Sequence, residues 1–152
     1  MEIEATHNAI LLVHFEEGQF VSRFTNVFEE KGFSLYHCPS IEEAYQILGS
    51  QSVEIVVLDM DENYDEAFKF CYRIKRNKNL EKIFVIGLSA AHTRFGIYID
   101  AHTREERNWL NCDLFVHKPI NARNLYLLLK KEIAIMKGID ATDLDSEQES
   151  WL

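Results

Sequence analysis

The feature that most constrains the fold of this chain is a short apolar run at residues 53–59. The run reads Val-Glu-Ile-Val-Val-Leu-Asp, so five of its seven residues are apolar and the last is Asp59. A short continuous run of this kind predicts a strand buried on both faces, as in a parallel sheet. In an open parallel α/β sheet, functional groups gather beyond the carboxyl ends of the strands. Asp59 therefore either presents a reactive carboxylate at that edge or merely caps the turn that follows.

Strand-like and helix-like segments alternate along the chain. Apolar or alternating runs predict further strands at residues 9–13, 33–37, 83–89 and 112–117. Helical spacing and N-terminal capping residues, among them Ser40 and Asn121, predict helices at about 20–31, 40–48, 65–76, 103–110 and 121–133. Because parallel strands are joined by right-handed crossovers, this order predicts an α/β fold, a doubly wound parallel sheet of five strands with helices on both faces.

The composition excludes several classes of protein. The 152 residues carry a formal net charge of −9, whereas non-specific binding to nucleic acid or anionic membranes requires a basic surface. No apolar run is long enough to span a membrane and residues 1–4 do not resemble a signal peptide, so we expect a cytoplasmic protein. Three widely spaced cysteines in apolar contexts favour buried thiols over a disulfide framework or a zinc site; they are Cys38, Cys71 and Cys112.

The composition changes near the C-terminus. Residues 139–150 contain five acidic residues and no basic one. A segment with so much charge of one sign cannot bury enough apolar surface to fold by itself. We therefore predict one folded domain over residues 1–137 and an acidic, flexible tail over residues 138–152.

Polar residues follow four of the predicted strands, and their order resembles a known family. The set resembles the receiver domain of two-component response regulators, which has an acidic cluster after strand 1 and a phospho-accepting aspartate after strand 3. That family has Ser or Thr followed by Ala after strand 4, Lys-Pro after strand 5, and a switch aromatic three residues before the lysine. The matching residues here are Asp59, Ser89-Ala90, Phe115 and Lys118-Pro119, and the segment after the first strand is His14-Phe15-Glu16-Glu17.

The resemblance implies a flavodoxin-like (βα)5 fold with strand order 2-1-3-4-5 and a role in phosphorelay signal transduction. It implies a phosphoprotein, not an enzyme, in which Asp59 accepts a phosphoryl group from a sensor histidine kinase or a small phosphodonor. In that family Mg²⁺, the lysine ammonium of Lys118 and the hydroxyl of Ser89 contact the phosphoryl oxygens. The resemblance also implies that phosphorylation draws the Ser89 hydroxyl inward and rotates the aromatic ring of Phe115.

The metal site departs from the pattern of that family. The positions of the acidic pair directly after the first strand hold His14 and Phe15. Phe15 cannot bind a metal ion, and His14 is a poor ligand for Mg²⁺, which prefers hard oxygen ligands. We therefore expect an atypical receiver, in which either the phosphoryl group is still accepted or the domain works as a phosphorylation-independent protein-interaction module. We expect its Mg²⁺ site to be weak or absent, with Glu16, Glu17, Asp59 and Asp61 as candidate ligands.

The face through which that family contacts its partners is also altered. The segment at residues 90–102, between the fourth strand and the fourth helix, is several residues longer than usual. Its aromatic stretch at residues 95–99 is either a loop packed on the body or an extra partner-binding strand. The resemblance implies a sensor histidine kinase or another signalling protein as partner, and a homodimer through the face of helix 4, strand 5 and helix 5.

Two other classes of site fit the sequence less well. A flavodoxin-like domain that binds a small ligand or cofactor needs a glycine-rich turn after the first strand. Here that turn has one glycine, Gly18, and two glutamates that repel phosphate. A transition-metal site would use imidazoles, yet no two of the candidate histidines have a ligand-like spacing; these are His14, His37, His92 and His117.

Overall fold

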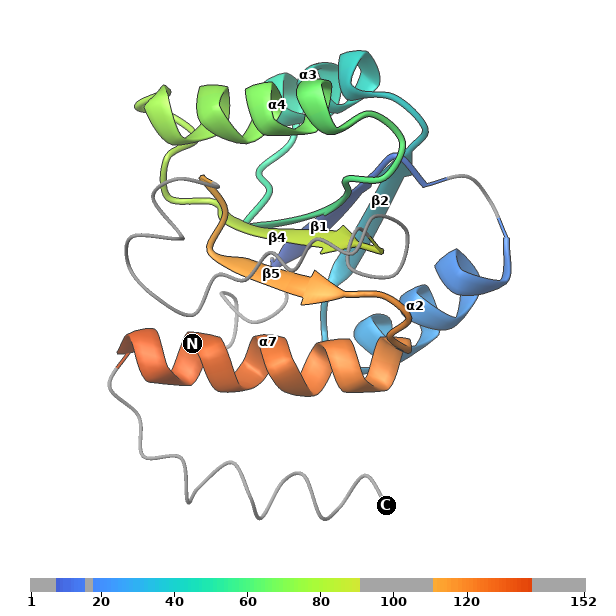
Figure 1. Ribbon diagram of the computed structural model, residues 1–152. Coiled ribbons are helices and arrows are strands. Elements are labelled where there is room, and N and C mark those ends of the chain that lie inside the picture. The colour runs from blue at the N-terminus through green and yellow to red at the C-terminus, as the bar shows by residue number, and fades with distance from the viewer. Residues whose placement is uncertain (1–7, 16–17, 91–110, 138–152) are drawn as a thin grey trace. The chain divides into compact units, whose positions relative to one another are not determined.

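The computed structural model describes residues 8–15, 18–90 and 111–137, which contain a five-stranded sheet (Figure 1). Its strands lie in the order β2-β1-β3-β4-β5, and every neighbouring pair is parallel. This confirms the predicted parallel sheet and the strand order of a flavodoxin-like fold. The strands are β1 (Ala9–Val13), β2 (Ser34–Cys38), β3 (Ile55–Asp59), β4 (Phe84–Ser89) and β5 (Leu114–His117).

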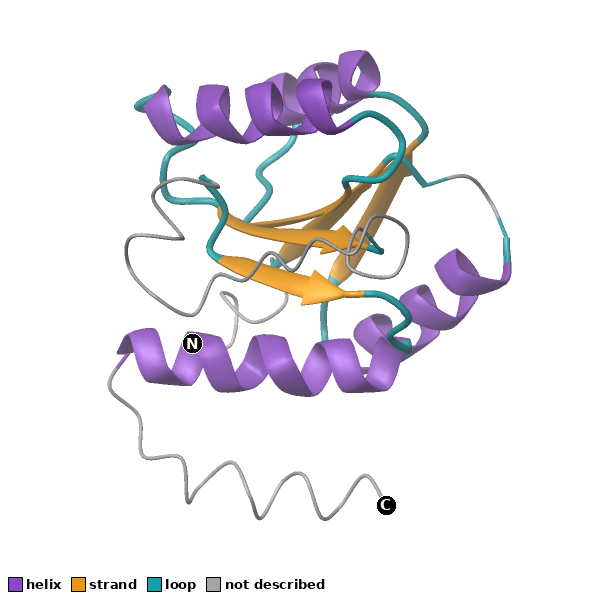
Figure 2. Cartoon of the chain, in the orientation of Figure 1, coloured by secondary structure: helices purple, strands orange, loops and turns teal. Residues whose placement is uncertain are grey.

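The described helices are α2 (Gln19–Glu30), α3 (Ile41–Ser50), α4 (Tyr64–Arg76) and α7 (Ala122–Lys137). The chain divides into two compact units, Met1–Pro119 with the whole sheet and Ile120–Leu152 with α7. Within the first unit, α3 and α4 cover one face of the sheet and α2 covers the other (Figure 2). Helices on both faces make this unit a doubly wound α/β fold. The boundary between a domain and a tail at residues 137 and 138 stays a prediction.

Side-chain caps fix the starts of three helices. Ser40, Asn63 and Asn121 each accept a hydrogen bond from the backbone N–H three residues later, at 3.2, 3.1 and 2.8 Å. Each cap satisfies an N–H group that has no partner inside its helix. The caps at Ser40 and Asn121 confirm the sequence prediction, and Asn63 starts α4 one residue earlier than expected.

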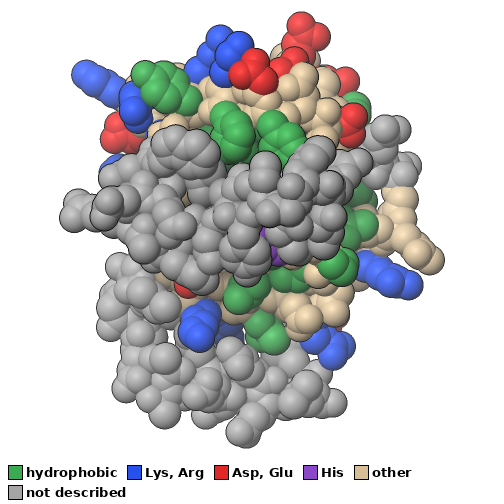
Figure 3. Space-filling view, in the orientation of Figure 1, with side chains coloured by type: hydrophobic (Ala, Val, Ile, Leu, Met, Phe, Trp, Pro, Cys, Tyr) green, Lys and Arg blue, Asp and Glu red, His purple; other side chains and the backbone are tan. Residues whose placement is uncertain are grey.

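The two faces of α4 differ sharply in character. Its inward face buries Ala67, Phe70, Cys71 and Ile74 in a core cluster that also contains residues of β1 and β3. Burial of an aromatic side chain such as that of Phe70 contributes about 1.5–3 kcal/mol. Charged side chains of both signs gather on the outer surface of the α3–α4 layer (Figure 3). This amphipathic pattern holds α4 against the sheet and so fixes the loop that precedes it.

The central strands are buried along almost their whole length. All residues of β1 and β4 are buried, and β3 is buried up to its last residue, whereas β2 at one edge of the sheet is largely accessible. Since all strands are parallel, the carboxyl ends of β3, β4 and β5 lie side by side. The polar residues at those ends, Asp59, Ser89 and Lys118, therefore share one edge of the sheet.

The strand β5 begins at Leu114, two residues later than predicted. Asn111 has the left-handed conformation predicted for it, with φ of 58°. Asp113 then bonds to β4 with its side chain: its Oδ2 accepts hydrogen bonds from Val85 N at 2.8 Å and from Lys75 Nζ at 2.6 Å. The backbone N–H of Asp113 also donates to the Val85 carbonyl at 2.8 Å, so this residue joins β4 through its backbone donor and its side-chain acceptor just before β5 begins.

Cys38, Cys71 and Cys112 are all buried, as the sequence predicted. Burial raises the pKa of the Cys38 thiol to about 11, an effect that the nearby Glu43 carboxylate reinforces and a hydrogen bond to the Ser40 carbonyl opposes. Burial also raises the pKa of Cys71. These thiols are therefore small apolar core residues and not nucleophiles.

Some sequence predictions concern residues that the structure does not describe. The helix at 103–110, the aromatic stretch at 95–99 and the tail at 138–152 all lie outside the described residues. Within residues 8–15, 18–90 and 111–137, no helix combines the length and the apolar character that crossing a bilayer requires.

Candidate functional site

The candidate site is built at the carboxyl ends of β3, β4 and β5. Beyond the ends of these strands the backbone pairing continues, since Met60 N donates to the Leu88 carbonyl and Lys118 N to the Ser89 carbonyl, both at 2.9 Å. These two bonds fix the residues that follow β3 and β5 relative to β4. The side chains at this edge are thus held on rigid elements and not on a long loop.

The carboxylate of Asp59 lies at the centre of this edge. Its Oδ2 accepts a hydrogen bond from Lys118 Nζ at 2.8 Å, and its Oδ1 accepts one from Asp61 N at 2.9 Å. About a fifth of the side chain is exposed, 21%, so Asp59 remains within reach of solvent. The structure therefore places Asp59, the candidate phospho-acceptor, beside a cation and at the surface.

Asp61 lies deeper in the site than Asp59, with a side-chain exposure of only 10%. Its Oδ2 accepts from Lys118 Nζ at 2.8 Å, and its Oδ1 accepts from Ser89 Oγ at 3.0 Å. The backbone N–H of Ala90 donates to both oxygens, at 3.0 and 3.2 Å. The Asp61 carboxylate thus links the lysine to the hydroxyl and lies in the midst of the donors.

Tyr64 is a part of the site that the sequence analysis missed. Its hydroxyl donates to Asp61 Oδ1 and lies 2.7 Å from Ser89 Oγ. Ser89 itself is completely buried, with 0% exposure. Tyr64 is the first residue of α4, directly after the Asn63 cap, and no sequence pattern marked it as part of the site.

The opposite charges of Asp61 and Lys118 keep both side chains ionised. Burial alone would raise the pKa of Asp61, but hydrogen bonds from Lys118, Tyr64 and the Ala90 amide hold it below its ordinary value. Burial alone would lower the pKa of Lys118, and its hydrogen bonds with Asp59 and Asp61 instead raise it. Asp61 is therefore an anion and Lys118 a cation at neutral pH.

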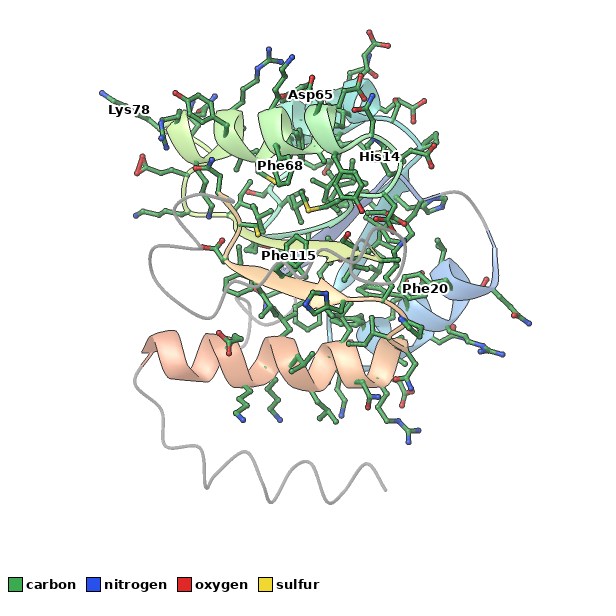
Figure 4. All side chains as sticks on the ribbon, in the orientation of Figure 1. His14, Phe20, Asp65, Phe68, Lys78 and Phe115 are labelled. Atoms are coloured by element: carbon green, nitrogen blue, oxygen red, sulfur yellow. The ribbon has the colours of Figure 1, made fainter. Side chains whose placement is uncertain are left out.

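The two residues that follow β1, His14 and Phe15, both make contacts with neighbouring elements. His14 has φ of 70° and its Nδ1 lies 2.9 Å from the Asp59 carbonyl oxygen, which accepts from it. The ring of Phe15 stacks on that of Phe20 at 5.3 Å between centroids. In Figure 4 the labelled His14 and Phe20 lie at the end of β1 and on α2. His14 thus connects the end of β1 to the end of β3.

The described residues do not fit a Mg²⁺ site of the usual kind. Mg²⁺ needs several hard oxygen ligands in octahedral geometry, and the carboxylates near β3 already accept hydrogen bonds from Lys118. No group of three His, Cys, Asp or Glu residues that could hold a metal ion occurs in the described part of the chain. Two of the candidate ligands, Glu16 and Glu17, lie outside the described residues.

Phe115 lies in the core beneath this edge. It is 6% exposed and belongs to the cluster under α3 and α4, and Figure 4 shows it pointing from β5 toward α4. Its position opposite Gly87 on β4 leaves its ring beside Met60. The candidate switch aromatic and Met60, the residue before Asp61, therefore both pack over Gly87.

The remaining candidate histidines do not gather at the site. His37 lies on β2 and His117 on β5, the two opposite edge strands of the sheet, while His92 is outside the described residues. The structure thus brings together Asp59, Asp61, Ser89 and Lys118. His117 pairs with Ser89 in the register of β4 and β5, while His37 lies on the opposite edge strand, so these two histidines cannot share a metal ion.

Comparison with known proteins places this fold. Neither a scan against protein-family models nor a search of curated proteins finds a match. Among solved structures, a response regulator from Thermotoga maritima is 21% identical with a TM-score of 0.64, covering 84% of this chain and 98% of that chain. The receiver domain of the TMAO respiratory response regulator TorR is 19% identical with a TM-score of 0.64, covering 88% and 99%.

A third similar chain comes from the complex of the histidine kinase ThkA with the response regulator TrrA. It is 21% identical with a TM-score of 0.60, and the match covers 82% of this chain and 97% of that chain. Identities this low carry information about the fold alone. The strand order, the parallel pairing and these neighbours agree: this chain has the receiver fold of response regulators.

Proposed function

We propose that this chain is an atypical receiver module of two-component signalling that acts chiefly by contact with a partner protein. Asp59 stands in the phospho-acceptor position, but attack of a carboxylate on phosphorus requires the charge of the phosphoryl oxygens to be neutralised. Lys118, which would supply a positive charge, already contacts Asp59 and Asp61 at 2.8 Å each. This sharing of one lysine between two carboxylates is the observation that carries the proposal.

The end of β1 supports the same function. An acidic pair there would add oxygen ligands for a metal ion beside Asp59, and His14 and Phe15 add none. His14 instead holds the backbone of Asp59, and Phe15 packs against α2 through Phe20. Without those oxygens the phosphoryl group loses a second source of charge neutralisation, so transfer to Asp59 is slow.

The partner is a sensor histidine kinase or another signalling protein. One of the similar structures is a complex between a histidine kinase and a response regulator, which shows that this fold can present a face to such a kinase. A homodimer through the face that includes β5 is a second arrangement open to the same module. In either arrangement, output depends on binding of the partner to this domain and not on phosphorylation of Asp59.

Labelling with acetyl phosphate in the presence of Mg²⁺ tests the proposal directly. We expect the intact mass of the wild-type protein to show little phosphorylation. Robust labelling that is abolished by Asp59→Asn would overturn the proposal, because it would demonstrate an efficient phospho-acceptor. Asp65→Asn is the matched control, since its carboxylate is 79% exposed at the start of α4 and should not affect labelling.

Complementation of a deletion strain provides the second test. An Asp59→Asn variant that folds should restore the output of the pathway, because contact with the partner does not require phosphorylation. Loss of output in this variant, with an unchanged thermal unfolding midpoint, would contradict the proposed mode of action.

A further inference from the structure

The carboxylate of Asp61 occupies a built anion site. Lys118 Nζ, Ser89 Oγ and the Ala90 N–H all donate to it between 2.8 and 3.2 Å, and the Tyr64 hydroxyl donates as well. A phosphoryl group on the adjacent Asp59 would need the same donors, since a cation, a hydroxyl and a backbone N–H are the groups that neutralise and orient its oxygens. An anion belonging to the chain itself therefore fills the place of that group.

The backbone before Asp61 directs its side chain inward. Met60 is completely buried, and its N–H extends the pairing of β3 with β4 through the Leu88 carbonyl. The Met60 side chain occupies the space that a Cβ on Gly87 would fill, because such an atom would lie only 2.6 Å from Met60 Sδ. The N–H of Asp61 then bonds to Asp59 Oδ1 at 2.9 Å. These contacts on both sides leave the Asp61 carboxylate pointing at Ser89.

We infer that Asp61 is a built-in substitute for the phosphoryl group, which holds Ser89 and Lys118 in their inward arrangement in the unmodified protein. This inference rests on the proposed function and deepens it, because it supplies the reason why output does not depend on phosphorylation. In the phosphorylated state implied by the resemblance, the hydroxyl is drawn inward by the phosphoryl group. Here the Asp61 carboxylate draws the Ser89 hydroxyl inward instead. The unphosphorylated protein therefore already has the arrangement of Ser89 and Lys118 that signals.

The same contacts oppose modification of Asp59. A phosphoryl group adds a charge of roughly −1.5 to −2. On Asp59 it would lie beside the Asp61 carboxylate, with Lys118 already shared between the two residues. The incoming group must therefore displace Asp61 from its donors before it can bind them. Asp61 thus both fixes the resting arrangement and competes with phosphorylation.

Chemical rescue with an external anion tests this inference without any metal ion. Asp61→Ala removes the carboxylate and leaves Lys118, Ser89 and the Ala90 N–H facing an empty site. We expect inorganic phosphate to bind there at millimolar concentration, to shift the Ala90 amide signal in a two-dimensional NMR titration at constant ionic strength, and to raise the unfolding midpoint of the variant. The wild-type protein should show no such binding, because its own carboxylate fills the site.

Two variants control this titration. Glu62→Ala removes an exposed carboxylate from the same loop, and it should behave as the wild type does. Adding Lys118→Ala to the Asp61→Ala variant should weaken phosphate binding at least about tenfold, because the cation that attracts the anion is gone. If the folded Asp61→Ala variant binds no phosphate, or if the wild type binds it equally well, the inference is wrong.

Output in cells separates this inference from the proposed function. Asp61→Ala should lose the output that the Glu62→Ala control retains, and phosphate binding in vitro shows that the Asp61→Ala variant is folded and its donors intact. Full output from Asp61→Ala would refute the inference while leaving the proposed function in place. Robust acetyl-phosphate labelling of the wild type would refute the proposed function instead.

Discussion

Replacing Gly87 by alanine should displace the side chain of Met60 and so destabilise the site and the fold. Gly87 lies in the middle of β4, and a Cβ added there would lie 2.6 Å from Met60 Sδ and 3.5 Å from both Met60 Cγ and Phe115 Cδ2. Real Cβ atoms do not approach a sulfur atom so closely, so the methionine must move. Because Met60 is completely buried and precedes Asp61, its movement shifts the loop that carries the inward carboxylate.

Two opposing contributions set the size of the effect. At a position that tolerates a side chain, glycine to alanine stabilises by about 0.4–1 kcal/mol through the unfolded chain. Overpacking of a core costs about 1–3 kcal/mol, and the flexible methionine keeps this case below the upper end. We therefore expect Gly87→Ala to lower the free energy of unfolding by about 1–2 kcal/mol, which corresponds to a fall in Tm of about 3–6 °C for a chain of this size.

Urea denaturation followed by circular dichroism measures this change, and Gly49→Ala is the matched control. Gly49 lies in α3 with nothing within 4 Å of an added Cβ, so the same substitution there should stabilise. A double-mutant cycle with Met60→Ala should show a coupling of at least about 0.5 kcal/mol, since the new methyl group fills part of the cavity. A neutral or stabilising Gly87→Ala would refute the steric argument.

Three further predictions concern charge and burial. Asp113→Ala should lower the free energy of unfolding by about 1–3 kcal/mol in urea titrations, because it leaves the Val85 N–H without its acceptor and removes the ion pair of Lys75, which keeps its hydrogen bond to the Ile83 carbonyl. Asp65→Ala should change it by less than about 0.5 kcal/mol. Cys38, whose pKa burial raises to about 11, should react with iodoacetamide at pH 8 only after unfolding in guanidinium chloride. Despite its burial, the hydrogen bonds of Asp61 hold its pKa below the ordinary value of an aspartate. The stabilisation from its carboxylate is therefore complete above that ordinary pKa and is lost as the pH falls through the folded pKa. Wild-type protein should therefore lose more stability than Asp61→Asn on acidification, as measured by Tm against pH.

The sequence predicted the sheet well because burial on both faces leaves a clear mark. Residues 9–13 form β1 with the predicted bounds, whereas β3 starts at Ile55 instead of residue 53 and β5 at Leu114 instead of residue 112. Both β3 and β5 begin later than predicted because an apolar residue before each strand is buried without pairing in it. These residues are Val53 before β3 and Cys112 before β5. Apolar runs therefore report burial reliably and strand pairing only approximately.

The arrangement of the site was predictable only in part. Asp59, Ser89 and Lys118 could be placed together because each follows a strand of one parallel sheet. The direction of the Asp61 side chain could not, because it depends on the space that Gly87 leaves for Met60, a contact between neighbouring strands. Sequence reasoning therefore treated Asp61 as a candidate metal ligand, and the structure shows it bound by hydrogen-bond donors.

The histidine at position 14 and the inward direction of the Asp61 side chain both affect the charge balance around Asp59. With an aspartate at position 14, a third carboxylate would lie near Asp59 and Asp61, and two like charges about 5 Å apart repel by roughly 3 kcal/mol at an effective dielectric of about 20. His14 removes that charge and donates to the Asp59 carbonyl instead. We therefore expect His14→Asp to lower Tm in the presence of a chelator and to recover part of the loss when Mg²⁺ is added, because the extra carboxylate supplies the missing oxygen ligand. Wild-type protein and a His14→Ala variant should show no such response to Mg²⁺, and an equal response in all three would show that position 14 does not control the charge balance of the site.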